Sequence, residues 1–368
     1  MVSIKTGGIH GLMEELKTKK LVCFGSGRYF ETVMRLYEPW QLDTYVAYIV
    51  DNDTSVHGTY KVYQGKEYEI VSLPTFLHRA DIRDTVLLVT SHIYCMEIIS
   101  RLDEESCLEG LAVYVGSFLS EVTGPAEPYV IDRAGVRRIP KVIHYCWFGG
   151  GDIPEEYLGY METWRRYCPD YEIRRWDESN FNVHGNRYMH QAYEKKKWAF
   201  VSDYARLAVI YEQGGIYLDC DVELVKSLEG LLSDRMFCGF EDQNHINLGL
   251  GFGAVKGHPY LKALMDEYDT LAFIKTDGSM DLTPCPARQT RVIQRFGIEA
   301  RNNYQRSGEI TAYPTEFFSP VSVWGTGKAT AATCAVHHFG ASWQTEEERE
   351  GTRDMYKAYQ NRLSGETG

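Results

Sequence analysis

The first third of this chain alternates short apolar runs with helical patterns, and this alternation restricts the fold more than any other feature of the sequence. We expect strands at residues 20–24, 45–50, 85–90 and 111–115, and helices at residues 28–37 and 94–102. Strands that alternate with helices pair in parallel, because each helix returns the chain to the starting end of the sheet. We therefore predict a Rossmann-like parallel-sheet domain at residues 1–120.

Two glycines, Gly25 and Gly27, follow the first predicted strand, and Asp51 and Asp53 follow the second. This is part of a dinucleotide-binding pattern, in which a phosphate meets a helix N-terminus and an acidic residue meets a ribose. Phe30 stands where the third glycine of that pattern would be. The turn is either a scaffold or a nucleotide site, and the incomplete pattern favours the scaffold.

The remaining chain is long enough for a second hydrophobic core. Residues 121–138 contain glycine and proline without periodicity, which predicts a linker. A new apolar strand starts at Ile139, and we predict a second α/β domain at residues 139–345. The charged segment at residues 346–368 is expected to form a helix at the surface.

Composition argues against several classes of function. The net charge is −12, and the longest basic run is residues 195–197, so we expect no nucleic-acid partner. No run approaches the ~18 consecutive apolar residues of a membrane span, and the first residues lack the apolar core of a signal peptide. The nine cysteines include no C-x-x-C pair, which argues against zinc and favours reduced thiols. We expect a cytoplasmic protein, at most peripheral to the inner face of the membrane.

The central segment combines a helix, a double glycine and a short strand that ends in two aspartates. Apolar residues at three- and four-residue spacing predict a helix that ends at residues 214–215. Asp219 and Asp221 lie two apart at the end of the strand, so both carboxylates point to one side. Two such anions repel each other, and we expect the loss of one to relieve that repulsion.

A hard divalent cation would join these two carboxylates and could also bridge a diphosphate. Mn²⁺ or Mg²⁺ fits this donor set, whereas an aspartate-rich turn without a ligand is the simpler alternative. On the preceding helix, Asp203 and Arg206 are three residues apart and share a face. They form either a surface ion pair or a carboxylate for sugar hydroxyls beside a guanidinium for phosphate.

Several motifs between residues 139 and 345 occur in an order that resembles a family of DXD-motif glycosyltransferases. That family includes bacterial capsular-polysaccharide transferases, yeast-type initiating mannosyltransferases and, more distantly, clostridial glucosylating toxins. The matching parts are the strand at 139–149, the W…P-x-Y…W-x-D stretch from Trp164, the run S-D-Y-A-R-L-A-V-I-Y-E-Q-G-G-I-Y-L-D-C-D, the N…G-A…G-H-P element from Asn247, and the pairs His337-His338 and Ser342-Trp343.

The resemblance implies a GT-A type nucleotide-sugar-binding domain and a retaining transfer of a hexose from a UDP-linked donor. It also implies roles for individual residues: Trp147 stacks on the base, Asp203 and Arg206 hold the donor, Asp219 and Asp221 bind the metal, Asn247 lies beside the donor sugar, and Ser342 and Trp343 close over the diphosphate. His337 and His338 could assist there. Cys220, between the two aspartates, is expected to point away from the site.

The expected function is therefore a hexosyltransferase whose acceptor is a cell-surface glycan intermediate or a lipid-linked saccharide. One alternative is a nucleotide-sensing regulatory protein whose transferase domain is idle. The presence of Asp203, Arg206, Asp219 and Asp221 together favours the enzyme. Another alternative is a toxin-like transferase that modifies a host protein, against which the lack of a translocation segment counts.

Overall fold

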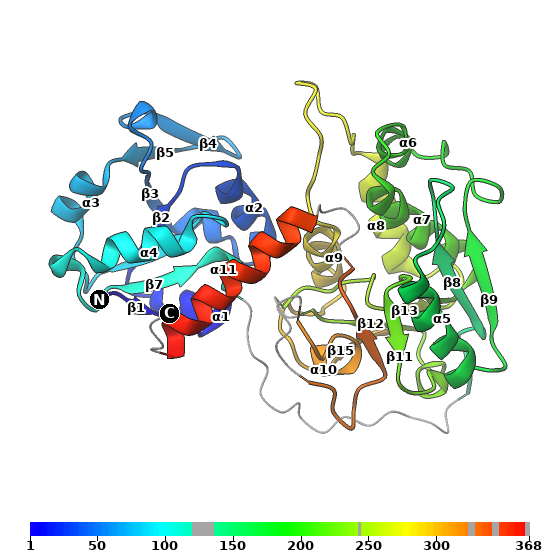
Figure 1. Cartoon of the computed structure of the whole chain (residues 1–368). Helices are drawn as coiled ribbons and strands as arrows, with labels where there is room; N and C mark the ends of the chain where they lie inside the picture. The colour runs from blue at the N-terminus through cyan, green and yellow to red at the C-terminus, as the bar shows by residue number, and fades with distance from the viewer. Residues whose placement is uncertain (120–135, 242–243, 323–327, 341–345, 365–368) are drawn as a thin grey trace. The chain divides into compact units, whose positions relative to one another are not determined.

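The computed structural model describes residues 1–119, 136–241, 244–322, 328–340 and 346–364. The chain divides into two compact units, one comprising Met1–Val122 and Thr345–Gly368, the other Thr123–Gln344. Each unit consists of a sheet with helices on its faces (Figure 1), so the expected α/β fold class is confirmed. Most of the predicted linker, residues 121–135 of 121–138, lies outside the described residues.

The sheet of the first unit has, among the described residues, seven strands in the order β1-β7-β6-β2-β3-β5-β4. Neighbouring strands are parallel except β4 and β5, which form an antiparallel hairpin. The four predicted strands and two predicted helices are present. The hairpin, the short strand Ser3–Ile4 and the helices Gly8–Glu15 and Leu73–Arg79 were not predicted. The strands are β1 (Ser3–Ile4), β2 (Lys20–Phe24), β3 (Val46–Val50), β4 (Tyr60–Tyr63), β5 (Lys66–Val71), β6 (Thr85–Val89) and β7 (Ala112–Val115); the helices are α1 (Gly8–Glu15), α2 (Arg28–Leu36), α3 (Leu73–Arg79) and α4 (Cys95–Asp103).

The glycine turn after β2 is fixed by contacts with neighbouring residues of the same unit. Gly25 has a φ of +114°, and a Cβ there would lie 2.8 Å from the carbonyl oxygen of Thr90. Asp51 accepts hydrogen bonds from the Ser26 amide at 2.7 Å and from the Ser26 hydroxyl at 2.6 Å. Because the Asp51 carboxylate is engaged within the turn, this arrangement favours the scaffold interpretation.

The C-terminal helix α11 (Glu346–Ser364) belongs to the first unit. The ring of Tyr359 is buried and stacks on Phe118 with 4.0 Å between centroids. Arg362 forms an ion pair with Asp103 at 3.0 Å. The predicted helix is thus present, but it packs through a buried apolar face instead of lying free on the surface.

The second unit has a mixed sheet in the order β14-β15-β12-β13-β10-β8-β9 within the described part of the chain. Strand β8 pairs in parallel with both β9 and β10, whereas β13 runs antiparallel to its neighbours β10 and β12. A separate two-stranded ribbon joins β11 to β16. The strands are β8 (Val142–Cys146), β9 (Glu172–Trp176), β10 (Gly215–Tyr217), β11 (Val222–Leu224), β12 (Met236–Gly239), β13 (Phe252–Ala254), β14 (Gln305–Ser307), β15 (Ile310–Tyr313) and β16 (Ala335–His337).

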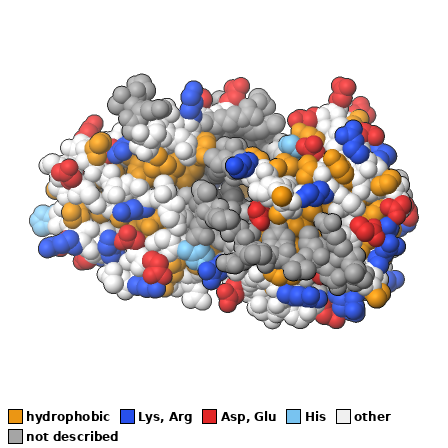
Figure 2. Space-filling model, turned by 90° about the horizontal axis from the view of Figure 1, so that it is seen from below, with side chains coloured by type: hydrophobic (Ala, Val, Ile, Leu, Met, Phe, Trp, Pro, Cys, Tyr) orange, Lys and Arg blue, Asp and Glu red, His pale blue; other side chains and the backbone are white. Residues whose placement is uncertain are grey.

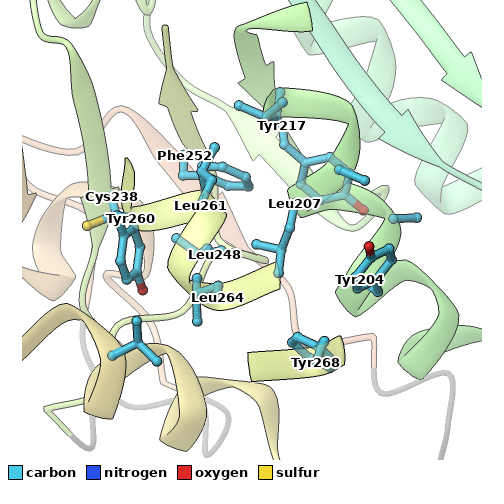
Figure 3. Close-up of a cluster of buried hydrophobic side chains, with 14 of the residues drawn as sticks. Tyr204, Leu207, Tyr217, Cys238, Leu248, Phe252, Tyr260, Leu261, Leu264 and Tyr268 are labelled. Carbon is cyan, nitrogen blue, oxygen red and sulfur yellow. The ribbon is translucent and has the colours of Figure 1, made fainter. Parts of the chain in front are cut away.

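Two hydrophobic clusters pack the helices of this unit against its sheet. Helix α7 lies in the larger cluster and contacts α6, α8 and β8. Figure 3 shows Tyr204 and Leu207 of α7 among side chains from β10, β13 and α8. Because α7 is enclosed in this way, it holds its polar residues in fixed positions. The helices are α5 (Glu155–Tyr167), α6 (Arg187–Glu194), α7 (Trp198–Gln213), α8 (Pro259–Asp269), α9 (Cys285–Gln294) and α10 (Thr315–Phe318).

Among the described helices, none combines the length and the apolar character needed to cross a membrane. On the face drawn in Figure 2, acidic and basic side chains are interspersed over the described surface.

Candidate active site

The two aspartates follow β10, a strand whose start is set by close backbone packing. Gly215 has a φ of +112°, and a Cβ there would lie 2.8 Å from both the His144 ring and the Val142 carbonyl oxygen. The His144 ring also bonds the Gly214 carbonyl oxygen at 3.0 Å. Only glycine fits this close approach, so the double glycine fixes where β10 begins and where its end places Asp219.

The carboxylates of Asp219 and Asp221 converge with a third group, the imidazole of His337. One ligand atom from each residue lies within 4.8 Å of the others. His337 reaches this position because β16 pairs antiparallel with β11, with Val222 opposite His337. Cys220 is buried, and its thiol points to the Cys146 carbonyl oxygen, as expected for the residue between the two aspartates.

The pKa values of the two aspartates in this cluster shift in opposite directions. Burial and the neighbouring Asp221 raise the pKa of Asp219, although Arg206 opposes the shift. Burial alone would raise the pKa of Asp221, but His337 and the Gly340 amide lower it well below its ordinary value. Burial would also lower the pKa of His337, but the two aspartates raise it. Asp221 and His337 therefore each favour the charged form of the other.

The donor set fits a hard divalent cation. His337 Nε2 and Asp221 Oδ1 are 3.3 Å apart, and bonds of about 2.1–2.6 Å at right angles would separate two ligands by about 3.0–3.7 Å. His337 Nδ1 is buried and has no hydrogen-bond partner among the described residues. Two carboxylates with one imidazole suit Mn²⁺ better than Mg²⁺, which prefers oxygen ligands.

Asp203 and Arg206 lie beside this cluster and are almost fully buried. Arg206 Nη2 donates to Asp203 Oδ1 at 3.0 Å, and Arg206 Nη1 lies 3.6 Å from Asp219 Oδ2. The Tyr217 hydroxyl donates to Asp219 Oδ1 at 2.8 Å, and the Arg206 guanidinium lies over the Tyr217 ring. One guanidinium thus joins the carboxylate on α7 to the first aspartate after β10, so a surface ion pair is excluded.

Asn247 completes this side of the site. Its side-chain oxygen accepts the Gly249 amide at 2.7 Å, and Gly249 accepts the Asp219 amide at 3.4 Å. A Cβ on Gly249 would collide with the Asp219 carboxylate and approach Arg206 to 3.0 Å. The predicted residues Arg206, Asp219 and Asn247 therefore surround one glycine, and Asp203 joins them through Arg206.

The sequence matches the family described as the glycosyltransferase sugar-binding region containing the DXD motif, over residues 154–238. It is also 35% identical over 218 residues to an uncharacterized glycosyltransferase, L373, of Acanthamoeba polyphaga mimivirus, covering 56% of this chain and 84% of that protein. The chain belongs to the DXD-motif glycosyltransferases. The predicted family and enzyme class are confirmed.

Other relatives match over shorter regions. Inositol phosphoceramide mannosyltransferase 3 of Schizosaccharomyces pombe is 31% identical over 139 residues, which cover 37% of this chain and 38% of that protein. This chain therefore spans less than half the length of that mannosyltransferase. Two solved structures are similar, each with a TM-score of 0.33. PaToxG glycosyltransferase is 18% identical, and the match covers 43% of this chain and 68% of that one. A glycosyltransferase involved in glycosylation of the PBCV-1 major capsid is 13% identical, and the match covers 59% of this chain and 100% of that one.

Trp147 follows β8 in this glycosyltransferase, and its side chain is partly exposed. Its indole N–H donates to the Gly151 carbonyl oxygen at 2.7 Å, and its ring meets Tyr157 edge to face at 6.4 Å. Tyr157 is stacked near Tyr160, whose ring lies 4.0 Å from that of His338. A row of rings thus leads from Trp147 to His338, the residue that follows β16. Ser342 and Trp343, the other predicted donor contacts, lie outside the described residues.

The sequence patterns did not assign His337 as a metal ligand or identify Glu241. Glu241 accepts a hydrogen bond from the Asn247 side chain at 3.0 Å. For His337, the adjacent pair His337-His338 was the pattern in the sequence that could have indicated a metal ligand. Glu241 had no such signal, because it lies between the matched motifs.

Proposed function

We propose that this glycosyltransferase is a metal-dependent, retaining enzyme that moves a hexose from a UDP-linked donor to a cell-surface glycan intermediate or lipid-linked saccharide. The observation that carries the proposal is the convergence of Asp219, Asp221 and His337 beside the buried Asp203–Arg206 pair. A divalent cation bound by the first three residues would neutralise the diphosphate that departs from the sugar.

The side chains of the chain itself would orient the donor. Arg206 is fixed by Asp203 and Asp219, so its position needs no rearrangement when a substrate arrives. Asp203, held on the enclosed helix α7, can accept a hydrogen bond from a sugar or ribose hydroxyl. Trp147 offers an aromatic face for the base. Ser342 and Trp343 remain predicted contacts of the diphosphate.

Retention of configuration needs either a protein nucleophile, which forms a covalent intermediate with the sugar, or attack on the sugar from the side that the diphosphate leaves. No carboxylate in the matched motifs is an obvious nucleophile. We favour this same-face attack, in which the departing diphosphate accepts the proton of the acceptor hydroxyl. The protein would then contribute positioning and charge stabilisation rather than a covalent intermediate. We also propose a cytoplasmic location, where thiols stay reduced, because none of the nine cysteines forms a disulfide.

The proposal is tested by donor hydrolysis in the absence of acceptor. The purified chain is incubated with a panel of UDP- and GDP-hexoses in Mn²⁺, and release of the nucleoside diphosphate is measured. We expect slow hydrolysis of a UDP-hexose, loss of at least about 95% of the rate in excess chelator, and recovery when Mn²⁺ is restored. Full activity in chelator would contradict the metal assignment, and hydrolysis of GDP-hexoses alone would contradict the donor. Nucleotide binding without hydrolysis or transfer to any glycan would favour the regulatory alternative.

A further inference from the structure

Residues 246–248 carry Asn247, and their side chains are divided between the core and the candidate active site. Ile246 and Leu248 are fully buried, and Figure 3 shows Leu248 among core side chains from α7 and α8. The side chain of Asn247 is instead partly exposed, and its oxygen accepts the Gly249 amide at 2.7 Å. The position of this segment in the core thus decides where the Asn247 carboxamide lies.

The backbone amides of this segment are bound from two elements. Asn247 donates to the last carbonyl oxygen of β12 at 3.1 Å. The two flanking amides donate to side chains of α9. Ile246 donates to Thr290 Oγ1 at 2.9 Å, and Leu248 donates to Gln289 Oε1, also at 2.9 Å. Two adjacent side chains of α9 therefore take the role that a paired strand has elsewhere in the sheet, because buried amides need acceptors.

The two acceptors on α9 are themselves held in place. Thr290 is 0% exposed and Gln289 is 1% exposed. The Thr290 hydroxyl donates to the Pro286 carbonyl oxygen, one turn earlier in α9, at 2.7 Å, so its lone pairs remain for the Ile246 amide. The Gln289 carbonyl oxygen accepts the Tyr260 hydroxyl at 2.9 Å, which joins this turn of α9 to α8. Because the acceptors are fixed, the amides that they bind are fixed as well.

We propose that Thr290 and Gln289 are positioning residues of this glycosyltransferase, which hold the Asn247 carboxamide at the donor sugar by binding the backbone amides on either side of it. This inference rests on the proposed function and on the predicted place of Asn247 beside the donor sugar. Loss of either acceptor leaves a buried amide without its partner, so the segment must shift to find another. The carboxamide then meets the sugar in the wrong geometry, and the chemical step slows.

The groups proposed to bind the nucleotide are held by other elements. Trp147 follows β8, Asp221 precedes β11, and His337 lies on β16. A displacement of residues 246–248 is therefore expected to slow the reaction of the sugar while the affinity for UDP is kept. This separation of kcat from nucleotide affinity distinguishes a positioning role from a general loss of the folded site.

The test uses Thr290→Val, which keeps the shape of the side chain and removes the oxygen that binds the Ile246 amide. On the nucleotide hexose that the wild type hydrolyses fastest, we expect kcat to fall about 10-fold. The UDP affinity in Mn²⁺, measured by calorimetry, should stay within about threefold of wild type. Thr290→Ser keeps the oxygen and should keep kcat within about threefold of wild type. Gln289→Met removes the second acceptor at similar volume and should reproduce the loss.

A double-mutant cycle with Asn247→Ala separates positioning from stability. Asn247→Ala should lower kcat about 100-fold. Adding Thr290→Val to it should change kcat by no more than about twofold, because no carboxamide is left to position. The matched control is Thr311→Val, which removes a buried hydroxyl of β15 that donates to Asp234 at 3.0 Å. It should lower the melting temperature as Thr290→Val does, yet keep kcat within about twofold. All rates are compared well below the melting temperature of each variant.

The inference is overturned if either Thr290→Val or Gln289→Met keeps kcat within about threefold of wild type. Losses that multiply in the double variant, or a loss for Thr311→Val as large as that for Thr290→Val, would also overturn it, because these hydroxyls would then act through stability alone. A loss of UDP affinity equal to the loss of kcat would do the same. An active wild type with unaffected variants leaves the proposed function standing. Should the wild type neither bind UDP in Mn²⁺ nor hydrolyse any donor, the proposed function itself fails, and this inference fails with it.

Discussion

Asp221→Asn is expected to reduce donor hydrolysis about 1,000-fold or more, which corresponds to about 4 kcal/mol of transition-state stabilisation. The substitution keeps the size of the side chain but removes the carboxylate that we expect to bind the metal together with Asp219 and His337. The proposed diphosphate would then lose its cation at the position where negative charge develops. Hydrolysis rates at saturating Mn²⁺ measure this effect.

The same substitution should cost about 1–3 kcal/mol of folding free energy. Asp221 accepts the Gly340 amide at 2.8 Å and faces His337, and its lowered pKa shows that these groups favour the ionised form. The repulsion expected from the paired aspartates is therefore outweighed, so removing one charge does not relieve strain. Denaturant unfolding measures the cost. Asp266→Asn, at an exposed position of α8, is the matched control and should change neither property.

Arg206→Ala is expected to have the largest effect on stability, a loss of about 3–5 kcal/mol. Its guanidinium lies between two carboxylates, and only 4% of the residue is exposed. Removal leaves Asp203 and Asp219 close together in a buried region, where they must lose a charge or admit water. Donor hydrolysis should also fall at least about 100-fold, because the donor-binding groups lose their fixed geometry.

Two further variants separate the charge of Arg206 from its shape. Arg206→Lys keeps the charge but cannot join both carboxylates through a planar fork, so intermediate stability is expected. Arg165→Ala removes an exposed arginine paired with Glu162 on α5 and should cost less than about 1 kcal/mol. If Arg206→Ala is no more destabilising than Arg165→Ala, the buried network does not hold this region together.

The elements with strong periodicity could be predicted from the sequence. The buried strands of the first unit and helix α7 each contain enough apolar residues for their spacing to be informative. The β4–β5 hairpin was not predicted. In the structure its turn residues, Gln64 and Gly65, both adopt positive φ, at 48° and 78°. That geometry suits a two-residue hairpin turn, which the sequence usually signals with Asn-Gly or Asp-Gly.

The missed site residues depend on contacts between distant or short segments. His337 reaches Asp221 only because β11 and β16, each three residues long, pair with each other. Strands of that length have too few residues to show a period. By contrast, Asp203, Arg206, Asp219 and Asp221 lie within one helix–turn–strand segment, so local geometry was enough to bring their motifs together.

The proposed function depends most on one divalent cation that Asp219, Asp221 and His337 bind and that the nucleotide diphosphate shares. A crystal grown with Mn²⁺ and UDP, measured at a wavelength where manganese scatters anomalously, tests it directly. We expect one anomalous peak within bonding distance of Asp221 and His337 and of a phosphate oxygen of UDP. UDP bound at Arg206 with no manganese peak at the three residues, or with the peak elsewhere, would show that these residues do not bind the metal.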